Sequence, residues 1–302
     1  MNLRERTLAL IKKYSIVPRK ELGQSFLVNE RVAQRIAELS QTDGLVVLEI
    51  GAGLGALTEP LASRARLVYA VEVDPILCKA LREEVLKGYD NIVLIEADFL
   101  DFTPPPVDVV VSNVPYSIAT PLLFKLAREC LFSRAVLTLQ KELALRITSK
   151  PGTKDYGRLT ASLDAFFSSR LLMLIRKRNF YPEPEVDSAV IALERRPPPY
   201  EIRDLDLYLE VVKWLFTQRN KLLRKALRTL MPKILPLKLD EKAYSDARLE
   251  KYMNKRVRDL QPSDFAYISN VLRDYLTQWG SGFEARLRGD GHTRVGRRLS
   301  SL

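Results

Sequence analysis

The sequence predicts an α/β protein with a parallel sheet in its first two thirds and a smaller α-helical domain after it. Strand-like and helix-like patterns alternate between residues 45 and 139, which is typical of parallel strands joined by right-handed crossovers. A glycine-rich turn at residues 51–55 separates the first strand from its helix. After three consecutive prolines at 197–199 the remaining pattern is helical.

Five strands are expected in the alternating stretch, because its apolar runs are rich in valine, leucine and isoleucine, as strands buried on both faces are. These runs cover residues 45–50, 67–73, 91–98, 107–112 and 135–139. Helices are expected between them at about residues 56–63, from Pro75 after an Asp74 cap, and from Thr120-Pro121. Aspartate is a favoured cap, and proline suits the first turn of a helix.

The later elements are two strand-like runs and three helical stretches. The strands are expected at 171–175 and 188–193, with a polar loop at 150–158 before them. Residues 179–187 between the strands are too proline-rich for regular structure. The helical stretches cover 204–230, 241–256 and 262–279. We therefore predict a first domain over residues 1–196, a helical domain over 200–279 and a disordered tail over 280–302.

The composition indicates a polyanionic partner. The 302 residues carry a net charge of +11, which favours nucleic acid over a membrane surface or a merely solvated basic surface. No apolar run approaches the roughly 20 residues of a membrane span, and the first residues lack a signal-peptide core. Two cysteines without a partner motif and a single histidine, His292, argue against disulfides, zinc and a histidine triad. We expect a monomeric cytoplasmic protein without a metal site.

Three acidic residues lie around the glycine-rich turn at the predicted carboxyl edge of the sheet. Glu49 precedes Gly51 and Gly53, Glu72 ends the second strand, and Asp98 ends the third. The turn fits a dinucleotide fingerprint and an adenosyl cofactor equally well. Glu72 suits ribose hydroxyls, Asp98 an adenine amino group, and Glu49 a sulfonium cation. So much negative charge suits S-adenosylmethionine better than a pyrophosphate, although each acid could also be a solvated strand end.

The fourth strand runs into Asn113, Val114, Pro115 and Tyr116. Open α/β sheets bind ligands at the carboxyl ends of their strands. An amide acceptor beside an aromatic ring suits a flat base held by its exocyclic amino group. The alternative is an ordinary turn followed by a core tyrosine.

Taken together, the motifs resemble the KsgA-type rRNA adenine N6,N6-dimethyltransferases. The resemblance extends from about residue 18 to residue 272 and rests on segments 22–27, 48–58, 113–116, 140–142, 156–159, 180–189 and 218–224. It implies a Rossmann-like class I methyltransferase sheet that uses S-adenosylmethionine, followed by a small helical domain. It also implies dimethylation of two adjacent adenosines in a hairpin loop near the end of small-subunit rRNA, within a pre-ribosomal particle.

The resemblance also implies roles for individual residues. Gln24, Ser25 and Leu27 match the N-terminal segment that contacts the cofactor, although Ser25 stands where relatives often carry Asn or His. Gly51, Glu72 and Asp98 match the glycine loop, the ribose ligand and the acid at the cofactor adenine, and Asn113 matches the catalytic asparagine, which also borders the cofactor.

We expect the Asn113 Oδ1 and the Val114 carbonyl to accept hydrogen bonds from the target amine. Pro115 would aim that carbonyl, and Tyr116 would stack on the base. Phe180, in the proline-rich segment, is the candidate for the opposite face of the base, the alternative being a core phenylalanine.

Residues 211–230 contain basic side chains and no acid, so one face of this helical stretch suits RNA phosphates. A solvated helix face is the alternative. The predicted RNA-binding residues are Arg219, Lys221, Arg224, Lys225 and Arg228.

Three other functions compete with the leading one. An Erm-type large-subunit rRNA adenine methyltransferase shares the Asn-x-Pro-Tyr motif, and a non-catalytic ribosome-assembly factor could use the same scaffold. An NAD-dependent oxidoreductase would leave residues 113–116 unexplained.

Overall fold

The computed structural model describes residues 1–18, 24–234 and 246–278, which form two compact units. The first unit consists of Met1–Thr148 and Phe167–Arg196. The second consists of Ser149–Phe166 and the described residues from Pro197 onward. Residues 149–166, which the sequence analysis assigned to the first domain, therefore pack with the later helices. The predicted tail at 280–302 lies outside the described residues.

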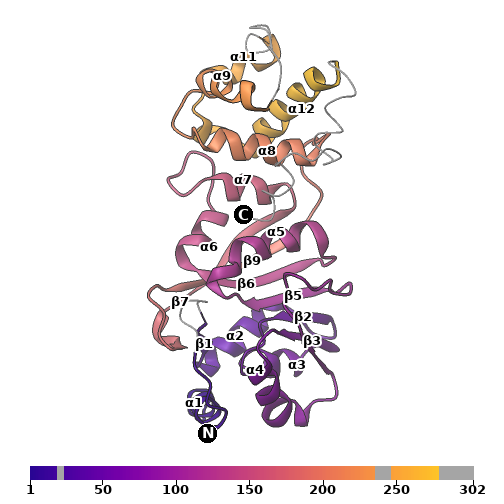
Figure 1. Ribbon diagram of the computed structural model, residues 1–302, viewed down its shortest axis with the longest axis vertical. Helices are drawn as coiled ribbons and strands as arrows, with labels where there is room; N and C mark the ends of the chain where they lie inside the picture. The colour runs from indigo at the N-terminus through magenta and orange to yellow at the C-terminus, as the bar shows by residue number, and fades with distance from the viewer. Residues whose placement is uncertain (19–23, 235–245, 279–302) are drawn as a thin grey trace. The chain divides into compact units, whose positions relative to one another are not determined.

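The first unit is built on a seven-stranded sheet in the order β4-β3-β2-β5-β6-β9-β7 (Figure 1). The strands are β2 (Val46–Ile50), β3 (Leu67–Glu72), β4 (Ile92–Glu96), β5 (Val109–Asn113), β6 (Arg134–Gln140), β7 (Phe167–Ile175) and β9 (Ser188–Arg195). The first five are parallel, and β9 runs antiparallel to both β6 and β7. The α/β prediction is confirmed, and each predicted strand forms. Chain order reverses between β2 and β5, so these two strands flank the switch point of the sheet.

Helices precede and connect these strands. They are α2 (Glu30–Ser40), α3 (Thr58–Ala62), α4 (Pro75–Ala80), α5 (Ala119–Glu129) and α6 (Lys141–Ile147). The predicted cap of α4 is present, since the Asp74 Oδ1 accepts from the Ile76 and Leu77 amides at 2.8 and 3.4 Å. A π-helical turn at Leu81–Val85 continues α4. Cys78 and Cys130 are both buried free thiols.

An N-terminal helix, α1 (Leu3–Lys13), was not predicted from the sequence. Its signal is a capping box, in which the Asn2 side chain accepts from the Glu5 amide and the Glu5 carboxylate accepts from the Asn2 amide, at 2.9 and 3.1 Å. Leu10 of this helix packs in a small apolar cluster that includes Phe26 and Leu54. The helix therefore supports the segments around the glycine-rich turn.

A second, two-stranded sheet joins β1 (Phe26–Leu27) antiparallel to β8 (Phe180–Tyr181). The prediction that residues 179–187 lack regular structure is therefore wrong at the start of this segment. The paired residues precede its first proline, Pro182, so both of them keep the backbone N–H that pairing requires.

The second unit is helical. Its elements include α7 (Arg158–Asp164), α8 (Leu205–Phe216), α9 (Leu223–Ile234), α11 (Glu250–Met253) and α12 (Pro262–Gln278). Part of the predicted helix at 241–256 lies outside the described residues. No helix in the described ranges is long and apolar enough to cross a membrane.

The single helical stretch expected over 204–230 is interrupted between α8 and α9. The interrupting turn pairs with residues far along the chain instead. The Leu223 amide donates to the Lys255 carbonyl at 2.9 Å, the Val257 amide to Lys221 at 3.0 Å and the Arg258 amide to Arg219 at 3.0 Å. These bonds satisfy backbone groups that a continuous helix would have satisfied locally.

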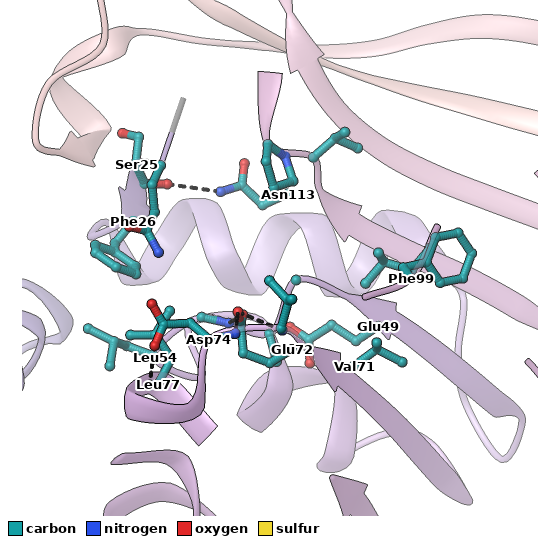
Figure 2. Close-up of a pocket in the computed structure, with 18 of the residues that line it drawn as sticks. Ser25, Phe26, Glu49, Leu54, Val71, Glu72, Asp74, Leu77, Phe99 and Asn113 are labelled. Carbon is teal, nitrogen blue, oxygen red and sulfur yellow. Dashed lines mark hydrogen bonds between the residues drawn. The ribbon is translucent and has the colours of Figure 1, made fainter. Parts of the chain in front are cut away.

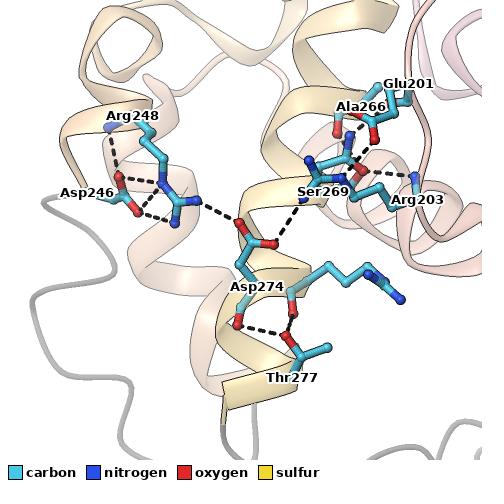
Figure 3. Close-up of polar contacts among 10 residues, drawn as sticks. Glu201, Arg203, Asp246, Arg248, Ala266, Ser269, Asp274 and Thr277 are labelled. Carbon is cyan, nitrogen blue, oxygen red and sulfur yellow. Dashed lines mark hydrogen bonds and ion pairs between the residues drawn. The ribbon is translucent and has the colours of Figure 1, made fainter.

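Charged side chains fasten α12 to two loops of the second unit (Figure 3). Asp274 on this helix accepts from Arg248 at 2.6 Å and from Arg203 at 3.2 Å. Arg248 also binds Asp246 at 2.8 Å, and this interaction lowers the pKa of Asp246 to about 2. The network therefore ties α12 to the segment before α8 and to the 3₁₀ turn at Ala247–Leu249.

Candidate active site

A cavity of about 390 Å³ opens at the carboxyl edge of the first unit's sheet, where β2 and β5 flank the switch point. Ligand pockets commonly have this size and this place in an open α/β sheet. Figure 2 shows residues from the ends of several strands around it. The predicted residues that line it are Gln24, Ser25, Leu27, Glu49, Gly51, Gly53, Glu72, Asp98, Asn113, Val114, Pro115, Tyr116 and Phe180.

Two glycines form the turn beneath the cavity. Gly51 and Gly53 adopt left-handed backbone angles, with φ of +76° and +59°, which residues with a side chain rarely adopt. A Cβ on Gly53 would lie 3.5 Å from the Phe26 ring, and one on Gly51 would lie 3.8 Å from Pro115. The turn therefore keeps the backbone accessible where β2, β1 and the segment after β5 converge.

Glu72 is buried at the end of β3 and is held by backbone amides. One carboxylate oxygen accepts from Gly53 at 2.8 Å, and the other accepts from Val73 and Asp74 at 2.9 and 3.0 Å. Burial raises the pKa of Glu72, and these three hydrogen bonds oppose the rise. Glu72 thus ties the glycine-rich turn to the neighbouring strand and presents its carboxylate to the cavity.

Glu49 is more deeply buried, with an exposed fraction of 1%. Its Oε2 has no hydrogen-bond partner among the described residues. Burial raises the pKa of this carboxyl to about 8, and the charge of Glu72 adds to the effect. Glu49 is therefore predominantly protonated at neutral pH.

Asp98 lies just beyond the end of β4 and is exposed. Its Oδ1 accepts from the Leu100 amide at 2.8 Å, which fixes the turn after the strand. With Glu49, Glu72 and Asp74, it makes four acidic residues along the cavity, and no described lining residue is basic. Such a cavity suits a cationic ligand without phosphate groups.

Asn113 ends β5, and its side-chain amide has one defined orientation. The Nδ2 donates to the Ser25 carbonyl at 3.2 Å (Figure 2). The Oδ1 occupies the other branch of the amide, where it can accept a hydrogen bond. Val114 is buried, and its amide donates to the Thr138 carbonyl of β6 at 3.1 Å. The backbone after β5 is therefore anchored on the sheet.

Tyr116 begins a short 3₁₀ turn after Pro115. Its hydroxyl lies 2.9 Å from the Ser188 Oγ, at the start of β9. Burial raises the pKa of Tyr116, which favours the neutral phenol. The hydrogen bond fixes a half-buried aromatic ring at the wall of the cavity.

Phe180 is 3% exposed, packs in the main core and also lines the cavity. Phe180 is therefore a core phenylalanine, as one alternative from the sequence has it, and it also lines the cavity, as the other alternative, a contact with the target base, requires. Ser25 lies opposite this segment, and its Oγ donates to the Pro182 carbonyl at 2.7 Å.

Sequence reasoning missed several apolar lining residues, namely Phe26, Leu54, Val73, Leu77 and Phe99. Two of these residues could have been predicted from the sequence, because Val73 directly follows Glu72 and Phe99 directly follows Asp98. An apolar side chain after each strand-end acid can contact the flat faces of a ligand whose polar edge the acid binds.

The five predicted RNA-binding residues all lie in the second unit. Arg219 and Lys221 are in the turn before α9, and Arg224, Lys225 and Arg228 are exposed on α9 itself. Arg219 is half-buried, and its Nη2 donates to the Lys154 carbonyl at 3.0 Å. Residues 255–258 pair with this turn through backbone hydrogen bonds. Three exposed basic residues, which the sequence analysis did not name, therefore lie beside the turn: Lys255, Arg256 and Arg258.

Known proteins are similar to this chain in sequence and in fold. Residues 17–274 match the family model described as ribosomal RNA adenine dimethylase. The chain is 43% identical over 270 residues to the probable ribosomal RNA small subunit methyltransferase A of Methanosarcina mazei, covering 88% of this chain and 97% of that protein. It is 36% identical over 287 residues to ribosomal RNA small subunit methyltransferase A of Listeria monocytogenes, covering 90% and 97%.

Solved structures of related proteins have a similar fold. A dimethyladenosine transferase from Plasmodium falciparum superimposes with a TM-score of 0.73 and 27% identity, covering 84% of this chain and 98% of that chain. The 23S rRNA methyltransferase ErmE gives a TM-score of 0.61 and 31% identity, covering 82% and 99%. The chain therefore belongs to the ribosomal RNA adenine dimethylase family.

Proposed function

We propose that this protein transfers methyl groups from S-adenosylmethionine to the N6 amines of two adjacent adenosines in small-subunit rRNA. The observation that carries the proposal is that Asn113 and Tyr116 share one cavity with Glu72 and Asp98. The first pair suits a target base and the second an adenosyl cofactor. Relatives named as small-subunit methyltransferases support the choice of RNA.

The lining residues fit S-adenosylmethionine. Four acidic residues, no basic one among the described lining residues, and an open glycine-rich turn suit a cation that carries no phosphate. Glu72 and Asp98 would bind the ribose and the adenine, with Gln24, Leu27, Gly51 and Gly53 beside them. When bound, the cofactor supplies an electrophilic methyl group on a sulfonium.

The chain's own residues would prepare the target amine. Its nitrogen lone pair is delocalised into the adenine ring, so the nitrogen must become more tetrahedral to react. Acceptors at its two N–H bonds, the Asn113 Oδ1 and the Val114 carbonyl, favour that change. Tyr116 would stack on the base and Phe180 would border its other face. Orientation and electrostatics then supply most of the rate, and the proton leaves after transfer, when the amine is acidic.

The second unit would bind RNA phosphates through a basic cluster, defined as Arg219, Lys221, Lys255, Arg256 and Arg258. These side chains come from two segments that backbone hydrogen bonds hold side by side. The exposed Arg224, Lys225 and Arg228 extend the positive charge along α9. A pre-ribosomal particle as the partner, a monomeric state and a cytoplasmic location stay predictions.

Incubation with labelled S-adenosylmethionine and undermethylated small ribosomal subunits tests the proposal. We expect label in small-subunit RNA, recovered as N6,N6-dimethyladenosine. Large subunits are the matched control. Label in large-subunit RNA instead would favour a large-subunit rRNA adenine methyltransferase of the Erm type, a second candidate function that the likeness to ErmE supports. No label in either RNA would indicate a non-catalytic assembly factor.

A further inference from the structure

We propose that Ser25 is a positioning residue, which orients the Asn113 amide through its backbone carbonyl and holds that carbonyl in place through its hydroxyl. The inference rests on the proposed role of Asn113 as the acceptor for the target amine. It assigns Ser25 a task other than the cofactor contact that the family resemblance implies.

The carbonyl of Ser25 selects one of two amide orientations. The Asn113 Nδ2 donates to it at 3.2 Å. If the amide were rotated by half a turn, the Asn113 Oδ1 would face the Ser25 carbonyl oxygen, and two acceptors would oppose each other. The observed orientation therefore keeps Oδ1 available as an acceptor, which is the atom that the reaction needs.

The hydroxyl of Ser25 secures the carbonyl's position. Its Oγ donates to the Pro182 carbonyl at 2.7 Å. Beyond it, Phe26 and Leu27 pair with Tyr181 and Phe180.

Residues 25–29 and 179–182 thus form a seam of hydrogen bonds, and two more bonds continue it. The Val28 amide donates to the Asn179 carbonyl at 2.8 Å, and the Asn29 Nδ2 donates to the Asn179 Oδ1 at 2.8 Å. Among the residues of this seam, Ser25 is the one whose carbonyl accepts from Asn113, and its hydroxyl makes its side-chain bond to the opposite segment. Its loss would release the carbonyl while the rest of the seam persists.

The same seam joins the two proposed base contacts. Phe180 lies on β8 and Asn113 on β5, and Ser25 bonds to the segment after the first and to the side chain of the second. One residue therefore couples the acceptor on the base's edge to the ring on its face.

Two variants test the inference, Ser25→Ala and the conservative Ser25→Thr. Ser25→Ala should lower kcat for RNA methylation about tenfold, the effect of one well-placed hydrogen bond. The dissociation constant for S-adenosylmethionine, measured by calorimetry without RNA, should stay within about twofold. Ser25→Thr keeps the hydroxyl and should retain kcat. Thermal unfolding of both variants checks that the fold is intact.

Three outcomes would overturn the inference. An unchanged kcat in Ser25→Ala would show that the hydroxyl is dispensable. A cofactor affinity that weakens as much as kcat would make Ser25 a cofactor contact. Equal loss in Ser25→Thr would show that the hydroxyl is not what matters. Asn113→Ala separates the two proposals: if it keeps full activity, the proposed role of Asn113 fails, whereas an inactive Asn113→Ala with a normal Ser25→Ala refutes only the inference.

Discussion

Glu49 shows how burial changes the role that a sequence suggests. Its position before the glycine-rich turn predicted a negative charge for a sulfonium. Burial instead raises its pKa to about 8. Glu72 differs, because its carboxylate accepts from three backbone amides, and these hydrogen bonds oppose the rise in pKa that burial causes. A cation in the cavity would favour the ionised form of Glu49.

Glu49 should make stability depend on pH. Because its folded-state pKa of about 8 lies above the ordinary 4.5, the folded protein holds a proton that the unfolded chain releases. This contribution is full below pH 4.5 and declines as the pH rises toward 8. Wild type should therefore lose stability relative to Glu49→Gln over this window, by on the order of a few kcal/mol. Urea unfolding of both proteins at several pH values measures the difference, and a pH-independent difference would contradict it.

Phe180 has two environments, so two variants are needed to separate them. Phe180→Ala should slow RNA methylation and also cost about 3–5 kcal/mol of stability, because a core ring is removed. Phe180→Leu retains most of the apolar volume and should mainly slow turnover. Cofactor affinity should stay near normal in both. The control is Phe132→Leu, a buried ring that stacks on Phe167 away from the cavity. Equal loss of cofactor affinity and turnover would refute the base contact.

The elements that sequence analysis predicted are those with a local cause. The central strands are continuous apolar runs because both their faces are buried, and Asp74 caps α4 through its own neighbours. Two of the missed elements depend on distant partners, whereas α1 has a local signal in its Asn2–Glu5 capping box. The strand at Phe26–Leu27 exists because it pairs with residues beyond 179, and the turn before α9 forms because it pairs with residues 255–258. Local pattern carries no information on either pairing.

The third glycine of the turn illustrates an element-level constraint. Gly55 does not line the cavity, but its φ is +82° and a Cβ there would lie 2.7 Å from Val85 in the π-helical turn. Gly55→Ala should therefore cost about 1–3 kcal/mol more than Gly44→Ala. Gly44 is the matched control, since its φ is +71° and a Cβ there would meet nothing within 4 Å. Chemical denaturation of both variants measures this, and equal costs would refute the packing constraint.

On the scale of the whole molecule, charge is divided between the units. Acidic residues line the cavity of the first unit, and the basic cluster lies in the second. Most of the polar residues that line the cavity were predicted from the sequence, because parallel strands bring their carboxyl ends to one edge. The sequence could not predict the hydrogen bonds of Ser25 or the arginines at 256 and 258, because distant segments create these contacts.

RNA binding should depend steeply on salt, because phosphate contacts release counterions. Lys221→Gln and Arg256→Gln should each weaken binding for all RNA sequences and reduce the slope of log K against log salt by about 1. Lys79→Gln, an exposed change on α4, is the control and should leave the slope unchanged. Binding titrations with a small-subunit RNA fragment at several salt concentrations measure the slopes. Identical slopes for all four proteins would argue against phosphate contact by the basic cluster.

The central claim is that the Asn113 carboxamide promotes methylation of adenine N6 in small-subunit rRNA. Mass spectrometry of nucleosides from undermethylated small subunits, treated with wild type or Asn113→Ala, tests it most directly. Under the proposed function, wild type should yield two N6,N6-dimethyladenosines per RNA, and Asn113→Ala should form them about 10²–10³ times more slowly, as loss of a key polar contact in a transition state does. Dimethylation by Asn113→Ala at the wild-type rate, or methyl groups on another atom or nucleoside, would contradict the account.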